Sequence, residues 1–268
     1  MFQITIFFLY IIAGFLFGMS RLPRFSSQDK MSLFVGFSSG ITGLLWHAWT
    51  LWLLIMVPAG ISLSIGNVAS FIALQLALIA IIGAAESSLR GLSGGLLILA
   101  GLVAVNTGGP APAGMADPLS WQIELHILIS LFAYGLLTVG AIVALYALIQ
   151  EKRLRAGMLS SVNQLFAPLE TTEKLLFGIT SAGFLALLVA VSTGFAFVEN
   201  LFAQHLVHKT ALSLLALTLF GLLLGGRRFS GWRGKRAVYL YLWGFLILCL
   251  AYFGTRFVLE QILGRSWS

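Results

Sequence analysis

The chain has very few charged residues, and this scarcity excludes a soluble globular protein. Asp, Glu, Lys and Arg make up 9% of the 268 residues, hydrophobic residues make up 59%, and the mean hydropathy is +0.98. A soluble domain needs roughly a quarter charged residues to solvate its surface. The composition therefore indicates an integral membrane protein that lies in a lipid bilayer. The net charge of +7 then reflects basic loops beside that bilayer, and we expect no nucleic-acid partner.

Cysteine is almost absent as well, and several chemistries are excluded with it. Because Cys249 is the only cysteine, the chain by itself cannot form an internal disulfide, a Cys-x-x-Cys relay or a covalent c-type haem attachment. The sequence also lacks the phosphate-binding G-x-x-x-x-G-K-[ST] loop and the G-x-S-x-G nucleophile motif. We therefore expect no nucleotide cofactor and no enzymatic activity, since no set of acid, base and nucleophile is recognisable.

Apolar segments long enough to cross a bilayer recur along the whole chain. Crossing the hydrocarbon core takes about 20 helical residues, so the sequence predicts an all-α, polytopic membrane helical bundle with about eight transmembrane helices. The predicted spans are 2–20, 33–57, 67–84, 91–106, 122–149, 172–198, 207–226 and 237–262. No linker or repeat separates them, so we predict a single integral membrane domain over 1–268. Within the first span, Gly14 and Gly18 have the spacing that lets a second helix approach closely.

The sixteen Lys and Arg residues are sorted between alternate loops. All except Lys209, Arg256 and Arg265 lie in or beside the loops that follow the first, third, fifth and seventh spans. Cytoplasmic loops retain basic residues, so these loops are predicted inside and both termini outside. The inner connection 150–171 mixes apolar and basic residues, and we expect a short helix on the membrane surface there, ended by Pro168.

Histidine is scarce too, and most of it lies near the predicted outer face. His47 lies in the second span, His126 at the outer start of the fifth, and His205 and His208 before or at the start of the seventh. A lone histidine near a helix end is usually a solvated or hydrogen-bonded residue. With three on one face of the membrane, a ligand set becomes an equal alternative to that reading.

Two metal chemistries are compatible with these histidines. Neutral imidazole is a good axial ligand for haem iron, and Lys209 and Arg256 could pair with haem propionates. Zinc is the weaker alternative, because no zinc-binding spacing is present. Its candidate ligands would be Glu124, Glu199, His205 and His208.

A series of short motifs in the C-terminal third has a recognisable order and spacing. They are Pro168-Leu169-Glu170, Ser192-Thr193-Gly194, His208-Lys209-Thr210, Gly225-Gly226-Arg227-Arg228, Gly231-Trp232-Arg233-Gly234-Lys235-Arg236 and Tyr252-Phe253-Gly254. With these motifs, the segment 166–256 resembles the C-terminal half of the CcsA-type cytochrome c assembly family, whose members handle haem. The short, eight-span outline is most similar to the bacterial subgroup of YpjD-like inner membrane proteins.

The resemblance implies a function and a location. The chain would be a multi-pass protein of the bacterial inner (plasma) membrane that binds or handles haem, or a related tetrapyrrole, without a covalent bond. The site would lie in the outer, periplasmic half of the helical bundle, and cytochrome c maturation proteins are candidate partners. The alternative is a non-haem permease subunit, or a membrane scaffold that docks a cytoplasmic partner on its basic loops.

The resemblance also implies which residues would hold haem. His126 matches the family's first outer histidine, and His47 matches its first membrane histidine. Lys209 matches the lysine of the family's W-D-P-K-E-x-W segment, although 207–211 lacks the Trp, Asp and Pro residues of that segment. No histidine follows residue 252, where the family has another outer one. We predict His126 with either His208 or His47 as axial ligands, assisted by Lys209 and Arg256.

Overall fold

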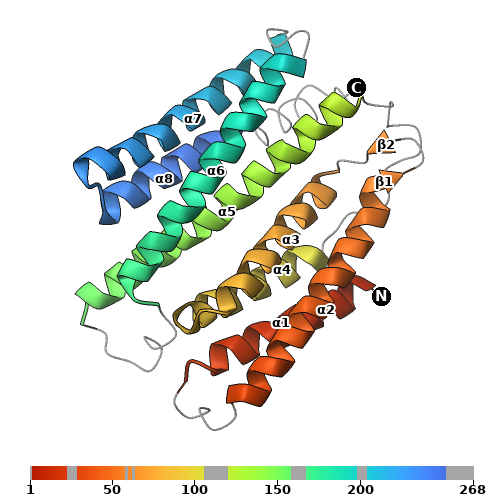
Figure 1. Cartoon of the computed structure of the whole chain (residues 1–268), viewed down its shortest axis with the longest axis vertical. Coiled ribbons are helices and arrows are strands. Elements are labelled where there is room, and N and C mark those ends of the chain that lie inside the picture. The colour runs from red at the N-terminus through yellow and green to blue at the C-terminus, as the bar shows by residue number, and fades with distance from the viewer. Residues whose placement is uncertain are drawn as a thin grey trace. The chain divides into compact units, whose positions relative to one another are not determined.

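The computed structural model describes residues 2–22, 29–57, 60–61, 64–105, 120–157, 167–197 and 204–251 (Figure 1). Within these ranges the chain forms eight α-helices and one very short hairpin. The helices are α1 (Phe2–Met19), α2 (Asp29–Ile55), α3 (Ile65–Ala84), α4 (Arg90–Val105), α5 (Trp121–Arg155), α6 (Leu169–Phe197), α7 (Gln204–Ser230) and α8 (Gly234–Cys249). The two-residue strands β1 (Met56–Val57) and β2 (Gly60–Ile61) pair antiparallel after α2, and the 3-10 turn η2 (Ser87–Leu89) precedes α4.

Six of the described helices are long and apolar enough to cross a membrane. They belong to α1, α3, α4, α5, α6 and α7. These helices confirm the prediction of an α-helical, polytopic membrane protein. The number of eight spans and the placement of both termini outside stay predictions.

The described helices fall into two compact units. Unit 1 comprises Met1–Leu119 and Gln150–Thr172, and unit 2 comprises Ser120–Ile149 and Glu173–Ser268. Unit 1 therefore contains α1 to α4 and the end of α5 with the start of α6, whereas unit 2 contains the rest of α5 and α6 with α7 and α8. The single domain over 1–268 stays a prediction.

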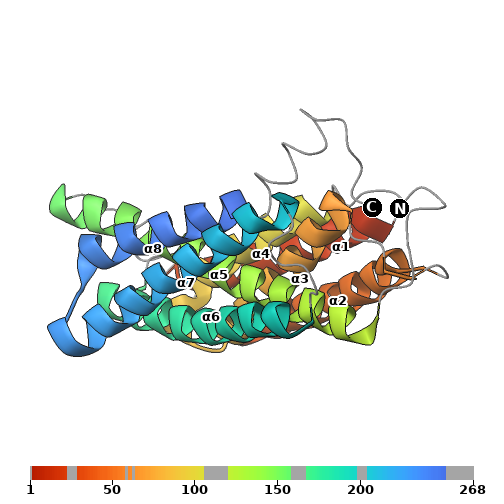
Figure 2. The same cartoon turned by 90° about the horizontal axis from the view of Figure 1, so that it is seen from above.

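The core of unit 1 is centred on α1, which packs against both α2 and α4, while α3 packs against α4 (Figure 2). The buried side chains of α1 are Ile6, Tyr10, Ala13 and Phe17, whose spacing of three or four residues marks one helix face. Glycines bring α1 close to α4, since a Cβ atom on Gly94 would lie 2.5 Å from the Gly14 carbonyl oxygen. This contact confirms that Gly14 permits a close helix approach.

In unit 2, α8 is fastened to α5 by two tyrosine hydroxyls. Tyr241 Oη donates to the Leu137 carbonyl at 2.8 Å, and Tyr134 Oη donates to the Leu248 carbonyl at 3.0 Å. Gly140 leaves room for the Tyr241 ring against the backbone of α5. Since no water is available in a bilayer core, these bonds give buried phenol groups the partners they need.

The first residues of the connection between α5 and α6 differ from the prediction, and over the rest of it the surface helix stays a prediction. Residues 150–155 continue α5 and do not start a separate helix. The reason is local: Arg155 pairs with Glu151 one turn earlier at 2.7 Å, and no helix breaker precedes Gly157, whose φ is 63°. Pro168 does precede the first residue of α6, as expected, while residues 158–166 lie outside the described residues.

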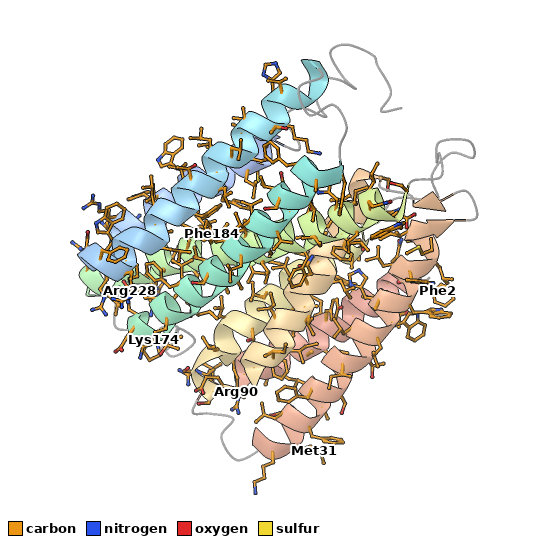
Figure 3. All side chains as sticks on the ribbon, turned by 45° about the horizontal axis from the view of Figure 1, so that its top comes forward. Phe2, Met31, Arg90, Lys174, Phe184 and Arg228 are labelled. Carbon is orange, nitrogen blue, oxygen red and sulfur yellow. The ribbon has the colours of Figure 1, made fainter. Side chains whose placement is uncertain are left out.

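Basic residues gather at one end within each unit. In unit 1, Arg90 at the start of α4 lies at the same end as Met31 near the start of α2, opposite Phe2 (Figure 3). In unit 2, Lys174 near the start of α6 and Arg228 near the end of α7 share one end. This arrangement is the one that the sorting of basic residues between alternate loops predicts.

Candidate functional site

His126 lies in the second turn of α5 and faces α6 within unit 2. Its Nδ1 atom is 3.0 Å from the Thr193 Oγ1 atom, near the end of α6. Gly194 makes room for the ring, because a Cβ atom at that position would lie 3.1 Å from His126 Cε1. The side chain of His126 is half-buried. Neighbouring residues of α6 therefore supply both a hydrogen-bond partner and the space for the imidazole.

The Thr193 hydroxyl determines which nitrogen of the ring carries the proton. Thr193 donates its single hydroxyl hydrogen to the Ala190 carbonyl at 2.9 Å, so its oxygen accepts the Nδ1–H of His126. In the neutral ring, Nε2 then carries the lone pair. Histidines that ligate metals usually donate their other ring N–H in this way, which fixes both the tautomer and the ring orientation. In this tautomer Nε2 is the ring nitrogen that has a lone pair to offer, and the role of His126 as a ligand stays a prediction.

Lys209 in α7 brings a positive charge to the neighbourhood of His126. Its ammonium group acts electrostatically on the His126 ring, and its side chain is partly buried. His208, the adjacent residue of α7, is exposed. Since successive helical residues point about 100° apart, the two side chains face different neighbours. The charge of Lys209 thus acts on His126, whereas the side chain of His208 is exposed on α7.

His47 lies in unit 1, where it belongs to a buried polar network. Its Nδ1 atom is 3.2 Å from Tyr10 Oη on α1, and its Nε2 atom is 2.8 Å from Ser70 Oγ on α3. The side chain of His47 is only 2% exposed. Because both ring nitrogens are engaged, an iron atom would have to displace one of these partners. In this arrangement His47 joins three helices.

Several predicted ligands cannot be placed. Arg256 and Glu199 lie outside the described residues, and so does the side chain of His205. In the part of the chain that is described, no group of three or more His, Cys, Asp or Glu residues could hold a metal ion. The alternative of a zinc site stays a prediction, because two of its four candidate ligands lie outside the described residues.

The C-terminal motifs build a turn between α7 and α8, and the sequence analysis did not predict the contacts within it. The Trp232 ring lies against Gly226, and its backbone N–H donates to the Gly226 carbonyl at 3.1 Å. Gly231 and Gly234 adopt φ values of 63° and 59°, which side-chain-bearing residues rarely accept. Glu173 Oε1 accepts the backbone N–H of Gly234 at 2.9 Å and so caps α8. The feature of the sequence that could have indicated this turn is the spacing of Gly226, Gly231 and Gly234 around Trp232.

The same turn presents a cationic surface. The Arg236 guanidinium lies 4.0 Å from the centre of the Trp232 ring, a cation–π contact that fixes its direction. Arg228 and Arg233 are exposed, and Phe229 between them is 87% exposed. An aromatic side chain thus protrudes among basic ones at this end of unit 2.

Comparison with known proteins identifies a family and individual relatives. Residues 35–263 match the cytochrome C assembly protein family. The chain is 37% identical over 138 residues to the inner membrane protein YpjD of Escherichia coli K12, and the alignment covers 52% of each chain. It is 32% identical over 157 residues, 58% of each chain, to an uncharacterized 28.8 kDa protein in the nifR3-like 5' region of Azospirillum brasilense. The chain thus spans about half the length of the curated relatives it matches, and no solved structure matches it.

These comparisons confirm the predicted resemblance and the predicted location. The matched region begins within α2 and runs beyond α8, so it includes elements of both units. With six long apolar helices and a relative named an inner membrane protein, the chain is a multi-pass protein of the bacterial inner membrane. It belongs to the cytochrome C assembly protein family.

Proposed function

We propose that this protein binds haem in unit 2, with Nε2 of His126 as an axial ligand to the iron. The observation that carries the proposal is the pair of hydrogen bonds that runs from His126 Nδ1 through Thr193 to the Ala190 carbonyl. This pair holds the imidazole in the tautomer that a metal ligand needs. A family whose description is cytochrome C assembly makes haem the expected cargo.

Other residues of unit 2 suit the remaining parts of a haem molecule. Haem has an apolar porphyrin face and two propionates, which need cationic or hydrogen-bonding partners. Lys209, whose charge acts on His126, is the residue that would pair with a propionate. His208 is exposed on α7 and would serve as a second ligand only from outside the α5–α6 contact. The proposed role is to hold and pass on haem at the periplasmic half, with cytochrome c maturation proteins as partners and without a catalytic step.

The first test is the absorption spectrum of the detergent-purified full-length protein from haem-replete cells, oxidised and then reduced with dithionite. We expect a Soret band in both redox states, and we expect His126→Ala to abolish it. His208→Ala should retain the spectrum. A flat spectrum that haem addition does not change would contradict the proposal.

The hydroxyl of Thr193 is tested separately, because it acts through His126. Thr193→Val keeps the side-chain shape and removes the acceptor for Nδ1–H. Loss of such a partner typically costs about 10–100-fold in metal affinity. The matched control is Thr218→Val in α7, since Thr218 is exposed and donates only to the Leu214 carbonyl of its own helix. Equal haem affinity in the two variants would show that the tautomer of His126 does not matter.

The exposed turn between α7 and α8 favours a second candidate function. Phe229 protrudes between Arg228 and Arg233, a combination that suits docking of an acidic protein surface. In this case the chain would be a non-haem permease subunit or a membrane scaffold with a cytoplasmic partner. A protein without haem absorbance that co-purifies with a cytoplasmic ATPase, and loses it in Phe229→Ser, would favour this function.

A further inference from the structure

The turn between α7 and α8 carries a dense positive charge that takes no part in the proposed haem site. The exposed cationic side chains within residues 228–236 are Arg228, Arg233, Lys235 and Arg236. Neither Asp nor Glu occurs between residues 200 and 259, so α7, α8 and the turn between them supply no carboxylate. The counter-charge for this turn therefore has to come from another element or from outside the protein.

One carboxylate of α6 does reach the turn, but it is already engaged. Oε1 of Glu173 accepts the Gly234 backbone N–H at 2.9 Å, and a single carboxylate cannot neutralise four exposed cations. In the part of the chain that the structure describes, the guanidinium groups of Arg228 and Arg233 have no hydrogen-bond or ion-pair partner. These two groups are available to an anion from outside the protein.

The backbone of the turn is held in place by contacts within unit 2. The Trp232 N–H donates to the Gly226 carbonyl at 3.1 Å, and Arg227 Nη1 donates to the Trp232 carbonyl at 3.3 Å. The Arg227 guanidinium also lies 4.6 Å from the centre of the Phe177 ring on α6. Because these contacts fix the backbone, the exposed cations keep their positions before any ligand binds.

An aromatic side chain protrudes from the centre of this charge. Phe229, next to Arg228, is 87% exposed. Exposure of a phenyl ring to water is unfavourable, whereas the boundary between lipid headgroups and acyl chains accepts it. Aromatic and basic side chains together are typical of segments that lie in this boundary. The exposed ring therefore favours a lipid surface as the neighbour of the turn.

The short length of the turn also favours a lipid surface over a protein partner. α7 is long and apolar enough to cross a membrane, and only residues 231–233 separate it from α8. Residues 225–230, which follow the apolar part of α7, add about 9 Å at 1.5 Å per residue. The headgroup layer on each side of a bilayer is about 5–8 Å thick. The cations thus lie at the level of the lipid phosphates, and an acidic protein would have to displace those headgroups.

We propose that the turn between α7 and α8 binds the headgroups of anionic glycerophospholipids. Arg228 and Arg233 contact the phosphate oxygens, since a guanidinium group matches phosphate in two-point contacts. Phe229 inserts between the headgroups and the upper acyl chains. A zwitterionic headgroup binds more weakly, because its own ammonium group is repelled by the arginines. The bound lipids would hold the ends of α7 and α8 at the membrane surface.

The test is native mass spectrometry of the full-length protein in detergent, titrated with phosphatidylglycerol or with zwitterionic phosphatidylethanolamine. The test variant is Arg228→Gln with Arg233→Gln. The control is Lys30→Gln with Lys152→Gln, which removes the same charge from exposed helix ends of unit 1. Each basic residue near a headgroup contributes about fivefold to affinity, so the test variant should bind phosphatidylglycerol roughly 30-fold more weakly. The control should bind as the wild type does.

The ring of Phe229 is tested separately, because an apolar contact does not distinguish one headgroup from another. Phe229→Ser should weaken the binding of both lipids by a similar factor, about tenfold. An affinity that Phe229→Ser leaves unchanged would overturn the insertion of the ring.

Several results would overturn the proposal as a whole. They are equal binding of the two lipids by the wild type, equal losses in the test and control variants, or displacement of phosphatidylglycerol by inorganic phosphate alone, which would indicate a soluble-anion site. Tight binding of a poly-glutamate peptide that phosphatidylglycerol cannot displace would identify an acidic protein surface instead. If the double variant does not fold, Arg228→Gln alone should still show the fivefold loss. Arg228→Lys with Arg233→Lys keeps the charge, so it should recover most of the lost affinity.

Discussion

The network of Tyr10, His47 and Ser70 leads to a prediction that separates a structural histidine from a haem ligand. His47→Leu removes both hydrogen bonds of the imidazole within a site that is 2% exposed. If His47 joins α1, α2 and α3, the substitution lowers the free energy of unfolding and leaves haem binding by the surviving folded protein unchanged. If His47 ligates iron, the substitution changes the haem absorption spectrum of the folded protein.

The expected loss of unfolding free energy depends on whether Ser70 and Tyr10 can find another hydrogen-bond partner after the substitution. Side-chain hydrogen bonds between transmembrane helices contribute about 0.6 kcal/mol on average and ~1.7 kcal/mol at most. Ser70 can turn its hydroxyl to a carbonyl of the preceding turn of α3, as Thr138 and Thr180 do in their own helices. Tyr10 is fully buried, and its phenol oxygen is too far from its own backbone for such a bond. An unpaired buried hydroxyl costs about 1–3 kcal/mol, so we expect His47→Leu to cost about 2 kcal/mol, mostly through Tyr10.

A double-mutant cycle isolates the free energy of the interaction between Tyr10 and His47. Tyr10→Phe, His47→Leu and the double variant are unfolded by SDS in mixed micelles, and tryptophan fluorescence reports the transition. Trp46 and Trp49 lie beside His47 on α2, so the helix under test contributes to the signal. We expect the double variant to lose about 1 kcal/mol less than the sum of the single losses. His208→Leu, on the exposed face of α7, is the control and should change little.

Two outcomes would refute the reasoning. Strictly additive losses would mean that Tyr10 and His47 do not share a hydrogen bond. A His47→Leu protein of unchanged stability and without a Soret band would mean that His47 ligates iron and that the network in unit 1 is not its role.

Two further predictions concern contacts that hold helices together. Gly94→Ala should cost about 1–3 kcal/mol of unfolding free energy, because its Cβ atom would lie 2.5 Å from the Gly14 carbonyl oxygen. Gly95→Ala is the control, since nothing lies within 4 Å of the added methyl group; equal losses would show that α1 and α4 are not in close contact. Glu173→Gln should cost about 0.3–1 kcal/mol at low salt, because the carboxylate at the start of α8 is lost while the hydrogen bond to Gly234 can persist. Adding salt should shrink that difference, and a difference independent of salt would argue against an electrostatic cap.

The helical architecture could be predicted because a bilayer leaves few alternatives. Backbone polar groups in hydrocarbon must be bonded within the segment, so long apolar runs become helices whatever their neighbours are. The ends of helices and the short hairpin were harder to predict from the sequence. The extension of α5 to Arg155 carries one local ion pair with Glu151, and the hairpin at Met56–Ile61 has only two residues in each strand. Neither feature produces a hydrophobic period that sequence analysis can detect.

The candidate site could be predicted only in part, because its partners are far apart in the sequence. His126 was identified from its place at a predicted helix end, but Thr193 lies on the next helix and its role appears only when α5 and α6 are side by side. His208 and Lys209 are adjacent, and only the structure shows that the His208 side chain is exposed while that of Lys209 is partly buried. The order in which helices pack cannot be read from hydropathy, so the partners of His47 on α1 and α3 were not foreseen.

The pairing of α1 with α4 has a consequence for the order of events during synthesis. Gly14 meets Gly94 only after the ribosome has made the roughly 80 residues between them, which takes roughly 4–16 s at the usual rate of translation. During that time α1 lies in the membrane and packs only against α2. The face of α1 that later contacts α4 stays uncovered. A chaperone or insertase that shields small-residue helix faces would act on this protein in that interval, before the fourth helix arrives.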